Sequence, residues 1–186
     1  MSKFCAILKK INGYIGLGVF AAMAVYALIM ATPTANTQYH EDTLAFYGAI
    51  QPINDQIIYL ALFGIVWSVI YKLLRNDIRK IFYISNFVWH GVYCIYAIVA
   101  SLLGFIGIAK YQAAWYALDF ASINDYLVSH DKAPLNPNTS IFMIGYIVCG
   151  LVLVSAILVG IVGVYMGVKR VQHEKEIKAE AEQEAK

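Results

Sequence analysis

The stretch of sequence that decides the fold covers residues 141–168 and reads IFMIGYIVCGLVLVSAILVGIVGVYMGV. It contains no Asp, Glu, Lys, Arg or Pro. A helix of about 20 apolar residues crosses the hydrocarbon core of a bilayer, so this stretch is long enough to span a membrane. Thr139 and Ser140 precede it and are suited to cap its first turn.

Three further apolar stretches precede it, at residues 11–31, 56–74 and 81–109. Asn54 and Asp55 precede the second of these and could cap its first turn. All of these stretches are too uniformly apolar for the amphipathic helices of a soluble protein. The composition agrees, because 60 % of the residues are hydrophobic and only 14 % are charged, against about 25 % charged residues in soluble domains. The sequence therefore predicts an all-α, polytopic membrane protein whose residues 1–168 form a bundle of four transmembrane helices.

The first stretch follows Lys9 and Lys10, as the apolar core of a signal peptide would. It is longer than the roughly 7–15 residues of such a core. Pro33 follows soon after its end and disfavours cleavage there. We therefore expect an uncleaved first span.

The distribution of basic residues predicts the orientation. Of the 14 Lys and Arg residues, Lys110 and Lys132 lie in segments 32–55 and 110–140, and the other 12 lie on the opposite face of the predicted bundle. Loops rich in Lys and Arg stay in the cytoplasm. We expect both termini and the short link at residues 75–80 to be cytoplasmic, most simply at the plasma membrane.

The second outer segment carries an aromatic and apolar face. Its residues 113–128 have helical spacing of apolar side chains, which predicts a short interfacial helix on the outer membrane surface. The side chains of this predicted outer contact surface are Trp115, Tyr116, Phe120 and Leu127. The polar tail at residues 169–186 is rich in strong helix formers, and is expected to be either helical or disordered.

His90 lies deep within the third predicted span, one helical turn after Asn86. One interpretation is a site that helps to bind haem b or a quinone through these two side chains. Haem in membranes usually has a second ligand, which a partner chain or a second copy of His90 would supply. The other interpretation is a neutral imidazole that hydrogen-bonds between helices.

Two outer loops each place an imidazole beside a carboxylate. His40 is followed by Glu41, and His130 by Asp131. If the loops approach each other, these residue types suit Zn or Cu. The alternative is that all four are solvated loop residues.

Small residues recur at helical spacing in the third and fourth spans and predict close helix packing. The packing candidates are Gly104, Gly160, Gly163 and Gly167. Their contacts can lie within the chain or with another subunit.

The sequence also excludes function classes. It contains no nucleophile elbow, phosphate loop or HExxH motif, so we expect no enzymatic activity. It has no basic cluster interleaved with aromatics, which argues against nucleic acid. The predicted spans lack charge at hydrocarbon depth and contain no proline, which argues against a transporter or channel. Segment 32–55 lacks the Trp and paired cysteines of claudins, and segment 110–140 lacks the Cys-Cys-Gly motif of tetraspanins.

The resulting hypothesis is a non-enzymatic accessory or scaffold subunit of a larger membrane complex, with lipid and other membrane subunits as partners. Two alternatives remain open. One is a redox-complex membrane anchor that uses His90, and the other is a small transporter or channel component.

Overall fold

The computed structural model describes residues 2–34, 36–74 and 83–184, and no strand occurs among them. The predicted link at residues 75–80 lies outside the described residues. The long helices are α1 (Ser2–Ala31), α2 (Glu41–Leu74), α3 (Tyr83–Tyr116) and α5 (Ile141–Glu184). Two short helices, η1 (Asn36–Gln38) and α4 (Phe120–Ser129), lie in the connections.

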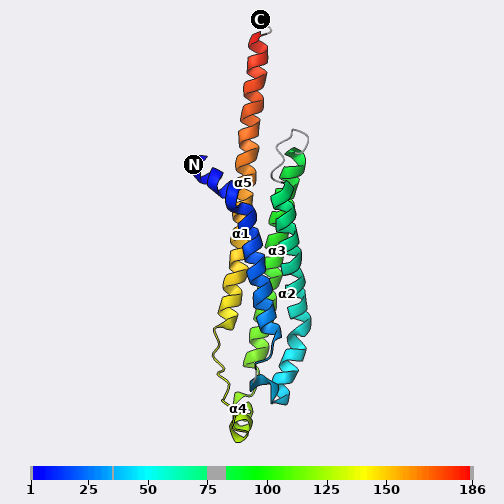
Figure 1. The fold of residues 1–186 in the computed structure, drawn as a ribbon, viewed down its shortest axis with the longest axis vertical. Coiled ribbons are helices and arrows are strands. Elements are labelled where there is room, and N and C mark those ends of the chain that lie inside the picture. The colour runs from blue at the N-terminus through cyan, green and yellow to red at the C-terminus, as the bar shows by residue number, and fades with distance from the viewer. Residues whose placement is uncertain (1, 35, 75–82, 185–186) are drawn as a thin grey trace.

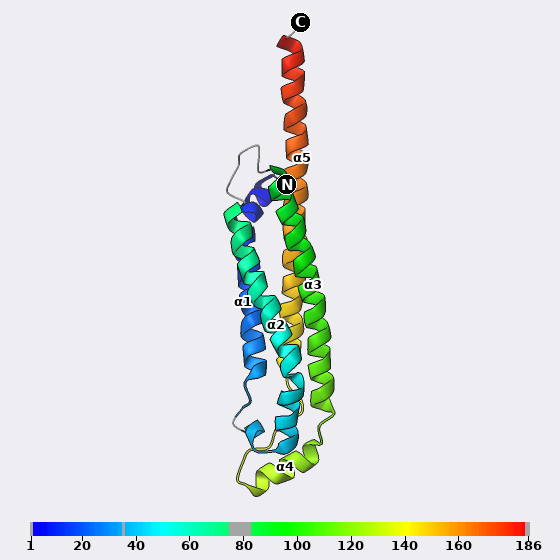
Figure 2. The same cartoon turned by 90° about the vertical axis from the view of Figure 1, so that its right-hand side faces the viewer.

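The four long helices lie side by side, and both chain termini are at the same end of the molecule (Figures 1 and 2). We call this the terminal end, and the opposite end, where α4 lies, the α4 end. All four helices are long and apolar enough to cross a membrane, which confirms the predicted number of candidate spans. These are Gly13–Ala31, Glu41–Leu73, Val88–Tyr116 and Ile141–Lys169.

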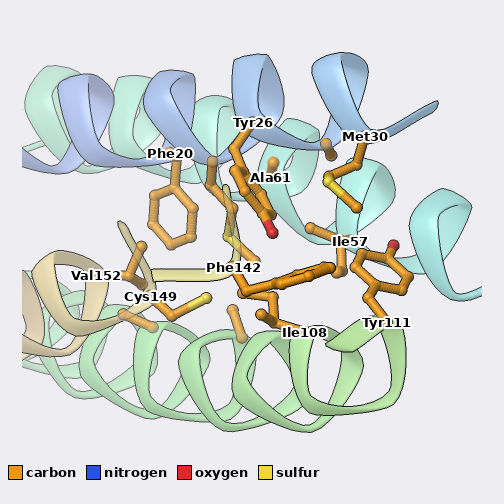
Figure 3. Close-up of a cluster of buried hydrophobic side chains, with 14 of the residues drawn as sticks. Phe20, Tyr26, Met30, Ile57, Ala61, Ile108, Tyr111, Phe142, Cys149 and Val152 are labelled. Carbon is orange, nitrogen blue, oxygen red and sulfur yellow. The ribbon is translucent and has the colours of Figure 1, made fainter. Parts of the chain in front are cut away.

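The inner faces of the helices form a core of aliphatic, aromatic and sulfur-containing side chains (Figure 3). Phe20 and Tyr26 of α1 point toward Ala61 of α2 and toward Cys149 and Val152 of α5 (Figure 3). The outer faces are also apolar, with large side chains that are mostly exposed, including Phe63, Leu73, Ile95, Met143 and Val164. So much exposed apolar surface is unfavourable in water, and it suits contact with lipid.

Helix α2 is longer than predicted. The sequence predicted a helix from Gln56 with Asn54 and Asp55 as caps, whereas the helix begins at Glu41. Pro52 lies inside it, although proline disfavours helix interiors because it lacks an N–H group. Asn54 faces the core instead of capping, and its Oδ1 accepts a hydrogen bond from the Tyr111 hydroxyl at 3.0 Å.

The predicted continuous helix over residues 113–128 is wrong, because the chain turns between Tyr116 and Phe120. Helix α3 ends at Tyr116 and α4 starts at Phe120. Asp119 caps the new helix, since its Oδ1 accepts from the backbone N–H groups of Ala121 at 3.1 Å and Ser122 at 3.3 Å. An Asp at this position satisfies N–H groups that have no partner within the helix.

The tail adopts the helical alternative. α5 continues without interruption to Glu184, and its last part extends beyond the ends of the other helices (Figures 1 and 2).

Candidate functional site

A cluster of buried polar side chains joins three helices in the half of the molecule nearer the terminal end. Ser68 and Tyr71 come from α2, His90 and Tyr93 from α3, and Ser155 from α5; all five are buried. Polar groups within a membrane protein need internal partners, because lipid offers none.

Two hydrogen bonds between helices hold the cluster together. The Tyr71 hydroxyl and Nε2 of His90 lie 2.9 Å apart, and the Tyr93 hydroxyl lies 3.1 Å from Oγ of Ser155. Ser155 donates its own proton to the carbonyl of Val152 at 2.7 Å. The Tyr93 hydroxyl is therefore the donor to Ser155, so this bond has a defined direction.

The rings of the cluster also pack on one another. The centroids of Tyr71 and His90 are 4.8 Å apart at an interplanar angle of 83°, an edge-to-face arrangement. Those of Tyr71 and Tyr93 are 5.5 Å apart. Aromatic pairs of this kind add about 0.5–1.5 kcal/mol to the effect of burial alone.

Two glycines allow the other helices to approach the cluster. A Cβ atom on Gly16 of α1 would overlap the hydroxyl of Tyr93. A Cβ on Gly163 of α5 would lie 3.4 Å from Cβ and Cδ2 of His90, at the near limit of ordinary van der Waals contact, so α5 passes close to this side chain. All four long helices therefore contact these side chains.

The surroundings of His90 are those of a side chain that is hydrogen-bonded between two helices. The side chain is only 4 % exposed, and Nε2, a nitrogen that would bind iron, faces the Tyr71 hydroxyl. Asn86 lies in α3 one turn earlier, and its side chain lies outside the described residues. The arrangement favours hydrogen bonding between helices, the second interpretation of the sequence.

The predicted metal ligands come partly together. The rings of His40 and His130 both pack on Tyr126, with centroids 5.2 and 4.2 Å from it. Glu41 and Asp131 are exposed. Nowhere in the described parts of the chain do three His, Cys, Asp or Glu side chains gather as a metal site. In the described structure the two histidines meet through the ring of Tyr126.

The predicted packing glycines lie mainly at contacts within the chain. A Cβ on Gly104 of α3 would lie 2.6 Å from Sγ of Cys149 on α5. One on Gly160 would lie 3.7 Å from Sγ of Cys94, an ordinary contact. Gly163 meets His90, as described above, and Gly167 is partly exposed.

The predicted outer contact residues do not form one surface. Trp115 and Leu127 are buried within the chain, and Tyr116 is half exposed. Phe120 packs on Trp115, with ring centroids 5.1 Å apart. A contact surface for another molecule in this region would therefore need other side chains as well as Tyr116.

The sequence interpretation singled out His90 and missed most of its partners. Tyr71, Ser68 and Ser155 were not identified, although hydroxyl-bearing residues inside apolar spans are the signal that could have found them. Their pairing depends on how helices far apart in sequence lie beside each other.

Comparison of the chain with protein-family models, with curated proteins and with solved structures finds no match.

Proposed function

We propose that this chain is a non-enzymatic accessory or scaffold subunit of a larger integral membrane complex. The observation that carries the proposal is the projecting part of α5, which we call the α5 extension and define as residues 169–184. The α5 extension projects beyond the ends of the other long helices (Figure 1). An isolated helix of this length is marginally stable in water, so a helix that persists here suits a binding role.

The composition of the α5 extension supports contact with protein. Val171 and Ile177 are large apolar side chains exposed on it, and Lys175, Glu176 and Glu180 are exposed charged residues. Such a mixture can pack against a partner helix while its charges set the register.

The interior of the chain supports a structural role. The polar groups of Tyr71, His90, Tyr93 and Ser155 bond to one another across helices, and this arrangement fixes the positions of α2, α3 and α5. A rigid set of spans with a projecting helix is suited to holding other subunits in place.

The proposal includes an orientation. The distribution of Lys and Arg supports a cytoplasmic position for both termini, and therefore for the α5 extension. The membrane that we propose for the four-helix bundle is the plasma membrane. Helix α4 would then lie at the outer interface. This helix has exposed Tyr126 and Val128 beside exposed Asp125, a mixture suited to a headgroup region.

Native mass measurement after purification in a gentle detergent tests the proposal. We expect the full chain to emerge with other membrane subunits. The double variant Val171→Glu/Ile177→Glu should release them while leaving the four spans folded. Gln172→Glu, another exposed site on the same helix, is the matched control and should retain them. A lone monomer under all mild conditions would overturn the proposal.

A further inference from the structure

A cavity of about 650 Å³ lies at the α4 end. Its lining comes from the last turns of α1, the first turns of α2 and α5, the end of α3, and the segments that connect them. The volume falls within the range of about 300–1,000 Å³ typical of pockets for small ligands.

The inner wall of the cavity is aromatic and apolar. Phe46 of α2, Trp115 of α3 and Phe142 of α5 all line it. The rings of Phe46 and Trp115 are 5.4 Å apart. The indole N–H of Trp115 donates to the carbonyl of Pro137 at 2.9 Å, so its one polar atom is already satisfied. This part of the cavity offers packing to an apolar chain.

One side wall is continuous with the outer surface of α1. Val25, Leu28 and Ile29 line the cavity, and each is also more than half exposed. In a membrane these side chains would touch lipid. A ligand would therefore enter sideways from the bilayer, with no need to pass through water.

The rim is polar and neutral. Thr32 and Thr37 donate their hydroxyl protons to the carbonyls of Leu28 and Thr34, each at 2.9 Å, and retain lone pairs that can accept. Oγ1 of Thr139 accepts from the N–H of Ile141 at 3.2 Å, which leaves its own proton to donate. Asn136 completes the rim.

No Asp, Glu, Lys, Arg or His is among the side chains that line the cavity in the described structure. A phosphate or a carboxylate would find no countercharge there, whereas a hydroxyl or an ester would find both donors and acceptors. The rim lies just beyond Ala31 and just before Ile141, where the apolar spans end and a lipid headgroup region begins.

We propose that this cavity binds one apolar chain of a neutral glycerolipid, with its hydroxyl- or ester-bearing end at the threonine rim. This site is independent of the proposed role as an accessory subunit. A chain that assembles with nothing could still bind the lipid.

Quenching of Trp115 fluorescence by a brominated acyl chain tests the site. The sequence has three Trp residues, so the double variant Trp67→Phe/Trp89→Phe leaves Trp115 as the sole fluorophore. This full-length protein is placed in phosphatidylcholine vesicles with increasing mole fractions of brominated monoacylglycerol. We expect saturable quenching, beyond what the same fraction of brominated phosphatidylcholine produces.

A matched pair of substitutions separates the cavity from the lipid-facing surface. Val25→Phe fills the cavity from α1, and Val66→Phe makes the same change on α2 away from the lining; the two valines are 55 % and 54 % exposed. Val25→Phe should raise the mole fraction of brominated monoacylglycerol needed for half-maximal quenching about tenfold. Val66→Phe should leave this mole fraction unchanged. Thr32→Val, which removes one rim hydroxyl without adding bulk, should also weaken binding of the lipid. Thr32→Ser, which keeps the hydroxyl, should bind it as the wild type does.

Two outcomes would overturn the proposal. Linear quenching that is equal in all variants would mean that Trp115 senses only bulk lipid. Equal, saturable quenching by brominated phosphatidylcholine would mean that the cavity does not select a neutral lipid.

Discussion

The Tyr71 hydroxyl on α2 and Nε2 of His90 on α3 lie 2.9 Å apart, within the buried polar cluster that joins α2, α3 and α5. This contact links two helices whose connection lies outside the described residues. It gives the sole histidine of the predicted spans a partner on the neighbouring helix, and the contribution of this contact to stability can be measured.

Removal of this hydrogen bond should destabilise the chain modestly. Tyr71→Phe keeps the ring and deletes the hydroxyl, so it isolates the bond to His90. Double-mutant cycles in membrane proteins give an average of about 0.6 kcal/mol for such bonds. We expect a coupling of that size between Tyr71→Phe and His90→Phe, measured by unfolding in mixed micelles.

The neighbouring bond supplies the control for this cycle. Ser155→Ala breaks the separate contact to Tyr93. It should show less coupling with Tyr71→Phe than His90→Phe does. Strict additivity of Tyr71→Phe and His90→Phe would contradict the structural role proposed for His90.

The packing of α1 against α2 depends on Gly64. A Cβ at this position would overlap the ring of Phe20, which is fully buried in the core. We expect Gly64→Ala to destabilise the protein by about 1–3 kcal/mol, the usual cost of overpacking, seen as a lower midpoint of thermal unfolding in detergent.

Gly48 is the matched control on the same helix, because a Cβ there meets no atom within 4 Å. Gly48→Ala should be neutral or slightly stabilising, since alanine favours a helix over glycine by about 0.5–1 kcal/mol. If both variants unfold alike, the close contact of Gly64 with Phe20 is incorrect.

The sequence was sufficient for the number of candidate spans, because long runs without charge have few alternatives to a membrane helix. It was not sufficient to predict the residues at which the helices begin and end. Helix α2 starts at Glu41, whereas Asn54 and Asp55 suggested a boundary further along the chain. Local propensity predicted that boundary, but Phe46, Ile50 and Asn54 are buried and extend the helix by packing.

The partners within the polar cluster also could not be predicted from the sequence. A lone His90 could be noticed from sequence, but neither Tyr71 nor Ser155 is near it in sequence. Which helix lies beside which follows from packing over the whole chain, and Gly16 contributes only by the side chain that it lacks.

The cap of α4 leads to a local prediction. Asp119→Ala removes the acceptor for the N–H groups of Ala121 and Ser122, at a cost of about 1 kcal/mol. Amide hydrogen exchange in the first turn of α4 should quicken. Asp119→Asn keeps an acceptor and should stay close to wild type. Asp125→Ala, also exposed on α4, should leave this turn unchanged; equal effects of Asp119→Ala and Asp125→Ala would argue against the cap.

The orientation can be tested with single cysteines placed at opposite ends. In a background that replaces all three native cysteines with serine, Asp125→Cys and Gln172→Cys both provide exposed thiols. A membrane-impermeant maleimide added to intact cells should label the first at once. It should label the second only after permeabilisation. The reverse pattern would place the termini outside.

The last prediction concerns the segment that leads into α5. Trp115 holds it through the hydrogen bond to Pro137 and packs against Phe46 and Phe120. Asn124 also fixes this segment, because its side chain donates to the carbonyl of Leu135 at 3.1 Å and accepts from the same residue's N–H at 2.7 Å.

Trypsin cleavage after Lys132 reports on this restraint. Trp115→Ala removes the hydrogen bond and the ring, and truncation of a buried Trp costs about 3–5 kcal/mol, so cleavage should accelerate strongly while the four spans stay inserted. Trp115→Phe keeps most of the packing and should give an intermediate rate. Tyr116→Ala, the half-exposed neighbour, should cleave nearly as slowly as wild type. If Trp115→Ala and Tyr116→Ala are cleaved alike, then Trp115 does not anchor this segment, and the aromatic wall of the cavity would have to be held by other contacts.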